Sequence, residues 1–381
     1  MELELTTDQR LFRETTRKFL EAECPITAVR ALEHDQRGYD MEYWRRGAAL
    51  GWTSMLIDEA DGGGNVSGEG LLDLVLIAEE MGRRVAPGPF LPTNVVAGAL
   101  ALSGSPQQRA AVLPGIVAGR IVAAWCHAGV GRHGDAHAVP IEGTRGGGDG
   151  FVLSGTAAPV EAAAQASYLL VPARTGSEVS QFIVAADAPG VVITPMAGID
   201  LVKRFAEVRF DSVEVPATAL VGEAGTGSTE IEHQLQRAIC LQCAETVGAI
   251  DRVFEFTLEY MDDRHSFGRS LSSYQALKHR FADMKVWLEA CHAAANGAAR
   301  AVQHRDGDAG EMVSAAAAYI GYHAVEIIHD CVQMHGGIGV TWEHDLHLYL
   351  RRATLNRALH GTPAEHRERI AVMLGMGRRA S

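Results

Sequence analysis

Two short polar segments carry residue types that suit a large ligand with phosphate groups. In the first, "DDRHSFGRSLSSYQ", Arg264 offers a planar, charged fork that matches phosphate oxygens. Phe267 offers an aromatic face for a ring, and Gly268 allows a close approach of the backbone. We expect one helix to end near Asp263 and the next to start by Gln275. Taken alone, the segment favours a helix hairpin with a surface ion pair.

The second segment, "QMHGGIGV", places Gln333 before two adjacent glycines, Gly336 and Gly337. Paired glycines at the end of a helix can be a simple C-cap. They also leave a stretch of backbone without side chains, on which a large ligand can lie. The two segments together therefore indicate a binding site for such a ligand.

A glycine-rich match at 129–134, "GVGRHG", fits the G-x-G-x-x-G pattern of dinucleotide-binding folds. That pattern requires a helix directly afterwards, whose N-terminus receives the pyrophosphate. The residues that follow, "DAHAVPIEGTRGGGDG", cannot form such a helix, so we predict a glycine-rich loop. The sequence has no G-x-S-x-G or Walker motif, which leaves a hydrolase or an NTPase without support.

The cysteines and histidines do not predict a metal centre. Cys240 and Cys243 form a lone C-x-x-C in a helical segment, without a second pair at zinc spacing, which favours two small core residues. A second grouping with possible metal ligands consists of Cys126, His127, His133 and His137. Because the chain has 16 histidines, such a grouping arises easily by chance, and we predict no metal site.

The elements that must position these residues fall into three regions. Thr6 and Gln9 form a capping box that opens a first helix, and helical patterns continue to Ala118. Short β-branched runs separated by Gly, Pro, Asp and Ser then predict a compact β unit. Long helices resume near Thr229, with apolar residues spaced by three and four, as in a four-helix bundle. The predicted domains are α-helical at 1–118, a β-barrel at 119–225 and a four-helix bundle at 226–381.

Composition limits the classes of partner. The 381 residues have a net charge of −13 and are 47% hydrophobic, as in an ordinary globular protein. Excess negative charge argues against nucleic acid and anionic membranes as partners, although local arginines can still bind a small anion. Six scattered cysteines, an N-terminus without a signal sequence and the lack of an apolar run of ~18 residues favour a cytoplasmic protein without a membrane segment.

The chain resembles an acyl-CoA dehydrogenase over almost its whole length. Four segments resemble family segments in order: "LTTDQRLFRETTRKFL", "LGWTSMLIDEADGGG", "AEEMGRRVAPGPFLPT" and "DLVKRFAEVRFDSVEVPATALVG". The R-x-x-F-G and Q-x-x-G-G-x-G motifs described above are the most specific part of the likeness. The resemblance implies the family's architecture, an α domain, a β-barrel domain and a C-terminal four-helix bundle, which matches the three predicted regions.

The resemblance also implies the chemistry. Members of the family desaturate an acyl-CoA between its α and β carbons, with a carboxylate as base and FAD as hydride acceptor, and pass electrons to an electron-transfer flavoprotein. FAD lies at a subunit interface. One chain holds most of the cofactor, and the neighbouring chain binds its ADP half. The residues of this sequence that carry that role over are Arg264, Phe267, Gln275, Gln333, Gly336 and Gly337.

The positions expected around the flavin ring and the base differ from the family pattern. In "LHGT", His360 occupies the usual position of the catalytic glutamate. In some family members the base instead precedes an arginine in an earlier helix. Here that position holds Gln236, which is followed by Arg237, a candidate substrate-binding residue. Pro159 and Glu161 replace an aromatic residue and a threonine that back the flavin ring, and "HAGVGRHGDA" replaces a flavin-binding loop. An anionic Glu161 would oppose reduction of the flavin.

Three functions are compatible with this pattern. The first is a base-less, non-catalytic subunit of a heteromeric α2β2 acyl-CoA dehydrogenase, paired with a homologous catalytic subunit, as known in bacterial breakdown of steroid side chains. The second is an active homo-oligomeric enzyme that uses His360 as its base, since an imidazole with a pKa near ~6.5 is competent at neutral pH. The third is a binding or regulatory protein that keeps the fold without redox chemistry. The acyl group, fatty or steroid, is not specified by any motif.

Overall fold

The computed structural model describes residues 5–127, 139–146 and 148–376. Its N-terminal part consists of helices packed around two buried tryptophans, Trp44 and Trp52. The predicted capping box is confirmed: Thr6 accepts a hydrogen bond from the backbone of Gln9, whose side chain accepts one from the backbone of Thr6. The helices are α1 (Thr7–Glu23), α2 (Ile26–Ala31), α3 (Met41–Ala49), α4 (Gly70–Arg84), α5 (Phe90–Ser103) and α6 (Pro106–Val117).

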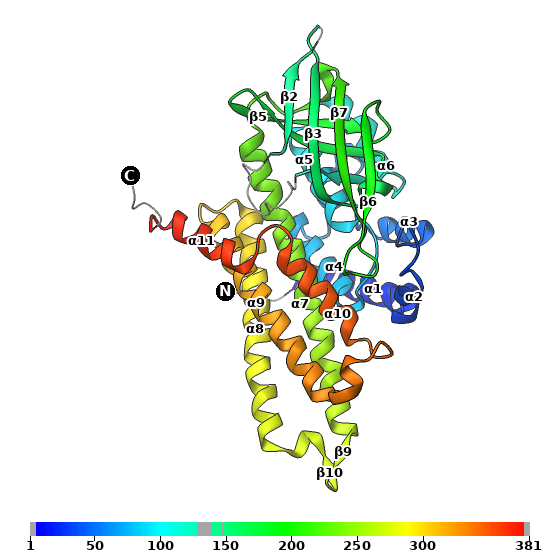
Figure 1. Ribbon diagram of the computed structural model, residues 1–381, viewed down its shortest axis with the longest axis vertical. Helices are drawn as coiled ribbons and strands as arrows, with labels where there is room; N and C mark the ends of the chain where they lie inside the picture. Colours follow the sequence, from blue (N-terminus) through cyan, green and yellow to red (C-terminus); the bar gives the residue numbers. More distant parts are fainter. Residues whose placement is uncertain (1–4, 128–138, 147, 377–381) are drawn as a thin grey trace.

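A sheet follows, drawn at the top of Figure 1, with its own apolar core. Its strand order is β6-β7-β3-β2-β4-β5-β8, and β1 pairs in parallel with β4. The long strands β3 and β7 pair antiparallel and place Phe205 opposite Glu161. The strands are β1 (Ala123–Trp125), β2 (Ile141–Arg145), β3 (Phe151–Glu161), β4 (Tyr168–Thr175), β5 (Glu178–Ala185), β6 (Val191–Met196), β7 (Phe205–Val215) and β8 (Leu220–Val221).

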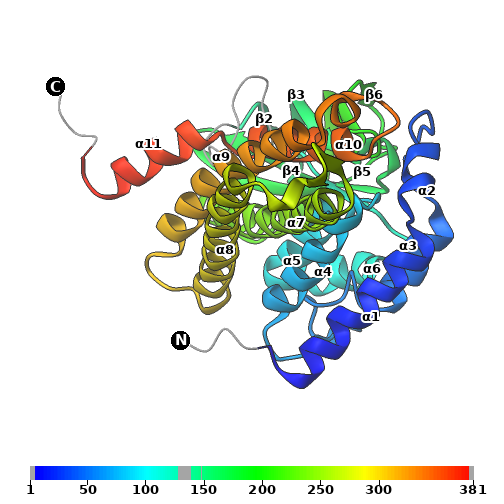
Figure 2. The same cartoon turned by 90° about the horizontal axis from the view of Figure 1, so that it is seen from below.

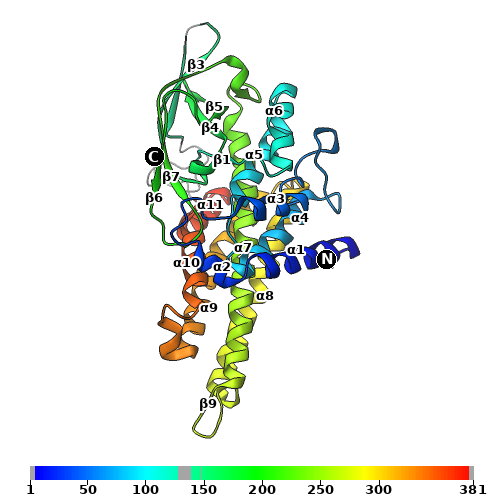
Figure 3. The same ribbon diagram turned by 90° about the vertical axis from the view of Figure 1, so that its right-hand side faces the viewer.

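The C-terminal part is a bundle of long helices that extends beyond the rest of the chain at one end (Figure 3). The predicted turn between two helices after Asp263 is confirmed, because one helix ends there and the next begins at Gln275. The predicted apolar seam of the second helix is buried, from Phe281 to Ala298. The helices are α7 (Gly227–Asp263), α8 (Gln275–His304), α9 (Ala309–His335), α10 (Leu346–Ala358) and α11 (Pro363–Met373).

The N-terminal helices and the bundle share one apolar core, and α4 and α7 touch backbone to backbone. A Cβ built on Gly248 of α7 would stand 1.8 Å from the carbonyl oxygen of Glu79, and one on Gly82 of α4 1.8 Å from that of Glu245. The view in Figure 2 shows α4 and α5 beside α7, with α8 and α9 on its other side. The domain boundaries at 118 and 225 remain predictions. Within the described residues, no helix is long and apolar enough to cross a membrane.

Candidate functional site

The predicted ligand segment around Arg264 forms a hairpin at the far end of the bundle, at the bottom of Figure 1. Two-residue strands, β9 (His265–Ser266) and β10 (Arg269–Ser270), pair on either side of Phe267. The hydroxyl of Tyr274 donates to the carbonyl oxygen of Ser266 at 2.8 Å and so ties the hairpin to the start of α8. Phe267 is 97% exposed. The turn therefore presents an aromatic ring to the outside of the chain.

The second predicted segment lies at the same end. The ring of Tyr260, one turn before Arg264, stacks on His335 at 4.4 Å between ring centroids, which brings the end of α7 against the end of α9. Gly336 follows with φ 65° and ψ −139°, a conformation that glycine adopts readily. No atom lies within 4 Å of a Cβ built on Gly336 or Gly337. All six predicted ADP-binding residues are exposed: Arg264, Phe267, Gln275, Gln333, Gly336 and Gly337.

His360 lies at the other end of α10, in the turn before α11, with φ 55°. The ring of Trp125 lies 5.8 Å from the His360 ring between centroids, and His127 stacks on Trp125 at 4.6 Å. The described residues around His360 leave a cavity of about 30 Å³. That cavity is lined by Leu91, Pro92, Trp125, His127, Pro159, Glu161, Phe205, Leu359 and His360. The three positions predicted to depart from the family, Pro159, Glu161 and His360, are thus brought together.

The carboxylate of Glu161 is one end of a buried chain of charges. Lys203 Nζ lies 3.3 Å from Glu161 Oε1 and 3.2 Å from Glu245 Oε2. Arg352, fully buried on α10, contacts Glu245 at 2.7 Å and Asp200 at 2.5 Å. Burial raises the pKa of Glu161, and Lys203 opposes that rise. Burial would also raise the pKa of Asp200, but Arg352 outweighs it and holds that pKa at about 2.

This chain of charges corrects one expectation from the sequence. Glu161 was expected to act as a lone anion beside a flavin, whereas Lys203 lies against it as a counter-ion. Two cations and three carboxyl groups pack between β3, the residues before β7, α7 and α10. Sequence inspection did not select Lys203, Asp200, Glu245 or Arg352, because these residues come from three segments that are far apart along the chain.

His366 lies beneath the turn that carries His360. Its side chain is 1% exposed, and a Cβ built on Gly361 would stand 2.8 Å from its Nε2. Burial lowers the pKa of His366 to about 4, and nearby Arg369 adds to the effect. The imidazole is therefore neutral at physiological pH. Glu365, the nearest carboxylate along the chain, instead completes the capping box of α11 with Thr362.

Arg237 lines a separate cavity of about 130 Å³ between α7, the end of α8 and the start of α9. His233 and Arg305 line the same cavity, so three basic side chains meet there. Burial lowers the pKa of Arg237, and Arg305 lowers it further. In the described part of the chain no carboxylate lies within ion-pair distance of Arg237. The side-chain amide of Gln236 donates to Glu232 at 3.2 Å. Because an amide does not titrate, Gln236 cannot act as the base.

Of the remaining motif predictions, one is confirmed and the others fall wholly or partly on residues outside the described part of the chain. Cys240 and Cys243 are buried core residues of α7 with free thiols, as predicted. The glycine-rich match at 129–134 lies outside the described residues. So do His133 and His137 of the four-residue metal grouping, and all of "HAGVGRHGDA" except His127.

The chain folds into N-terminal helices, a central sheet and a C-terminal bundle of helices. This fold is that of a known class of flavoenzymes. Residues 6–120 match the family described as "Acyl-CoA dehydrogenase, N-terminal domain" and residues 225–374 match "Acyl-CoA dehydrogenase, C-terminal domain". The chain therefore belongs to the acyl-CoA dehydrogenase family of FAD-dependent oxidoreductases, and the predicted fold class is confirmed.

Particular relatives cover nearly the whole chain. The protein named acyl-CoA dehydrogenase IpdE2 of Mycolicibacterium smegmatis is 29% identical, over 96% of this chain and 98% of its own length. A solved structure of a variant of the Tcur3481-Tcur3483 steroid ACAD is 28% identical with a TM-score of 0.87, covering 97% of this chain and 98% of that one. The ChsE4-ChsE5 complex of Mycobacterium tuberculosis contains a chain that is 26% identical, with a TM-score of 0.86 and full coverage of both chains.

The described residues suit the nucleotide part of FAD at the end of the bundle that carries the predicted ADP-binding residues. The exposed ring of Phe267 and the bare backbone at Gly336 and Gly337 form an open surface that a nucleotide can cover. The cavity beside His360, about 30 Å³ as the described residues leave it, is far smaller than the volume of roughly 150 Å³ that holds a single benzene ring. The segment that follows His127 in this lining lies outside the described residues.

Proposed function

We propose that this chain is the base-less subunit of a heteromeric α2β2 acyl-CoA dehydrogenase, in which it binds the ADP half of FAD for a homologous catalytic subunit. The assembly desaturates an acyl-CoA thioester between its α and β carbons and passes electrons to an electron-transfer flavoprotein. Acyl chains of the fatty or steroid side-chain type are the proposed substrates. Two solved relatives support the assembly, because each is named for a pair of chains, Tcur3481-Tcur3483 and ChsE4-ChsE5.

One observation carries this proposal: the residues predicted to bind the ADP half of FAD are open to solvent, whereas the residues beside His360 leave little space. The six ADP-half residues are exposed at one end of the bundle. At the other end of α10 the side chains close the space beside His360. The one carboxylate that lines this space among the described residues, Glu161, is held by Lys203 and is not available as a general base, which must be free to accept a proton.

A second candidate is an active homo-oligomer with His360 as base. The imidazole lines the cavity at the position where the family places its glutamate, which favours this alternative. On either function, Arg237 and Arg305 offer positive charge to an anionic group of acyl-CoA, because the two guanidinium side chains line the same cavity.

The test is to purify the chain alone and together with its catalytic partner, and to record flavin absorbance and acyl-CoA-dependent reduction of an artificial electron acceptor. The chain alone is expected to be colourless and inactive, and the complex yellow and active. Stoichiometric flavin and robust turnover from the chain alone contradict the proposal and support the second candidate. If the chain gives neither bound flavin nor turnover, alone or with a homologous partner, both enzymatic functions are contradicted. The third function, a binding protein on this fold, is then supported.

A further inference from the structure

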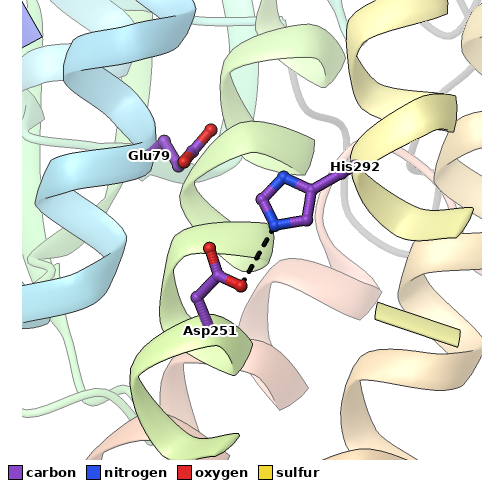
Figure 4. Close-up of side chains that lie close together, drawn as sticks. All are labelled: Glu79, Asp251 and His292. Carbon is purple, nitrogen blue, oxygen red and sulfur yellow. Dashed lines mark hydrogen bonds and ion pairs between the residues drawn. The ribbon is translucent and has the colours of Figure 1, made fainter. Parts of the chain in front are cut away.

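Three side chains from three helices converge on one point between α4, α7 and α8. They are Glu79, Asp251 and His292, and one ligand atom from each lies within 4.8 Å of the others (Figure 4). His292 Nε2 lies 3.0 Å from Asp251 Oδ1. Figure 4 shows the carboxylates of Glu79 and Asp251 both facing the imidazole ring. The cluster is remote in sequence from every motif discussed above.

Two of the three helices that carry these side chains, α4 and α7, are in close backbone contact. The backbones of α4 and α7 touch at Gly82 and Gly248, as described above. That contact includes the carbonyl oxygen of Glu79 itself, which lies against Gly248, three residues before Asp251. Ligands held on rigid helices are pre-positioned, which is the usual requirement of a specific ion site.

The Glu79 carboxylate is only partly exposed, and no hydrogen bond or ion pair within 4.0 Å joins it to the described residues. Its nearby electrostatic partner is His292, which opposes the rise in the pKa of Glu79 that burial causes. Asp251, by contrast, is shared between His292 and the more distant Arg83, at 3.7 Å. A buried carboxylate without a partner is costly unless a proton or a cation joins it.

The donor set suits a particular class of cation. One imidazole nitrogen and two carboxylate oxygens are ligands that Zn²⁺ and its first-row neighbours accept, and the remaining positions of such an ion take water. The side chains of Asp251 and His292 are 17% and 25% exposed, which leaves room for those waters. Ca²⁺ and Mg²⁺ fit less well because they prefer oxygen ligands alone.

We propose that Glu79, Asp251 and His292 form a binding site for one divalent transition-metal ion, of which Zn²⁺ is the representative. The ion joins α4, α7 and α8 and stabilises the packing of the N-terminal helices on the bundle. The competing explanation is a protonated His292 between two carboxylates, which needs no ion. The two differ in whether the cluster binds a metal with a stoichiometry of one.

The experiment uses the full chain in its purified assembly, free of affinity tags and treated with a chelator. Co²⁺ is added and its visible absorption recorded, and Zn²⁺ is then used to displace it. Glu79→Gln, which removes a carboxylate that accepts no hydrogen bond from the described residues, and His292→Gln are compared with His323→Gln, a histidine of α9 outside the cluster. Circular dichroism checks that each variant is folded.

One saturable equivalent of Co²⁺ per chain in the wild type and in His323→Gln is expected, with a rise in Tm on addition of Zn²⁺. Glu79→Gln and His292→Gln are expected to lose both responses. Absence of a saturable equivalent in the folded wild type overturns the proposal, and so does binding that both cluster variants retain. None of these readouts depends on flavin, on a partner chain or on turnover.

Discussion

Lys203 lies 3.3 Å from Glu161, a residue that lines the cavity beside His360 and takes the place of a family flavin contact. The same ammonium lies 3.2 Å from Glu245 on α7, so one cation neutralises side chains of the sheet and of the bundle at once. The ion pairs of Lys203 therefore link the sheet to the bundle inside the chain, and their loss should lower its stability.

Replacing Lys203 with methionine is expected to lower the free energy of unfolding by about 3–5 kcal/mol, because two buried carboxylates lose their shared cation. Urea denaturation measures the change. The double variant Lys203→Met/Glu161→Gln should recover part of the loss. Lys285→Met is the matched control, since Lys285 forms an exposed pair with Glu289 within one helix and such a pair contributes only about 0.5 kcal/mol. A loss at Lys203 as small as that of the control contradicts a structural role for the pair.

His366 is expected to make stability fall with acid. Its pKa in the folded chain, about 4, is below the ordinary value of 6.5, so the unfolded chain binds more protons between those two values. Stability from this group is complete above pH 6.5 and is lost as pH falls towards 4. The difference in unfolding free energy between wild type and His366→Gln should therefore shrink by about 3 kcal/mol over this window. A difference that stays constant with pH contradicts the assignment.

Arg264 is expected to matter for cofactor retention and little for folding. Its side chain is exposed in a turn, so Arg264→Ala opens no cavity. Loss of a charged contact to phosphate should weaken FAD binding in the assembled enzyme by about 1.5–3 kcal/mol. Flavin content after gel filtration and Tm are the two measurements, with the exposed Arg145 on β2 as a matched arginine-to-alanine control. A sharp fall in Tm with normal flavin content would count against the prediction.

Gly337 and Gly339 should respond in opposite ways to valine. A Cβ at Gly337 meets no atom within 4 Å, so Gly337→Val should assemble normally and fail to hold FAD. A Cβ at Gly339 would stand 2.7 Å from the carbonyl oxygen of Val332, so Gly339→Val should destabilise the chain. Native mass spectrometry of the complex and its flavin absorbance separate the two effects. Normal flavin occupancy in Gly337→Val would show that this glycine only ends a helix.

His360 distinguishes the two enzymatic functions. In a heteromer with a silent subunit, His360→Ala leaves the turnover of the assembled enzyme nearly unchanged. His360→Glu does not create a second active site, because Pro159 and Glu161 line the same cavity in place of the family's flavin-ring contacts. In an active homo-oligomer, loss of a positioned base costs about 10²–10⁴-fold in rate. Acyl-CoA-dependent reduction of an artificial acceptor measures both cases. Robust turnover of the chain alone that His360→Ala abolishes would overturn the silent-subunit proposal.

The sequence was most informative where the signal is local. The capping box at Thr6, the helix end at Asp263 and the helix start at Gln275 depend on residues within one or two turns, and the structure confirms them. Pro159, Glu161 and His360 could be grouped because the family resemblance supplied the contacts that composition and spacing do not contain.

Contacts between distant segments could not be predicted. Glu161 and Lys203 are 42 residues apart, and Asp251 and His292 are 41 apart, on different elements in both cases. Each charged residue read singly is typical of a solvated surface position. Their removal from solvent follows from the packing of the sheet and of α4, α7, α8 and α10 against one another, which no periodicity within a single element encodes.

The backbone contact of α4 with α7 at Gly82 and Gly248 limits how the chain can be divided. A fragment ending near residue 118 would keep α4 but expose the face that Gly248 covers, together with the apolar residues that share its core. The helical N-terminal region, although it matches a family model of its own, therefore depends on the bundle for its packing. Biophysical work on this region requires the bundle to be present in the same polypeptide.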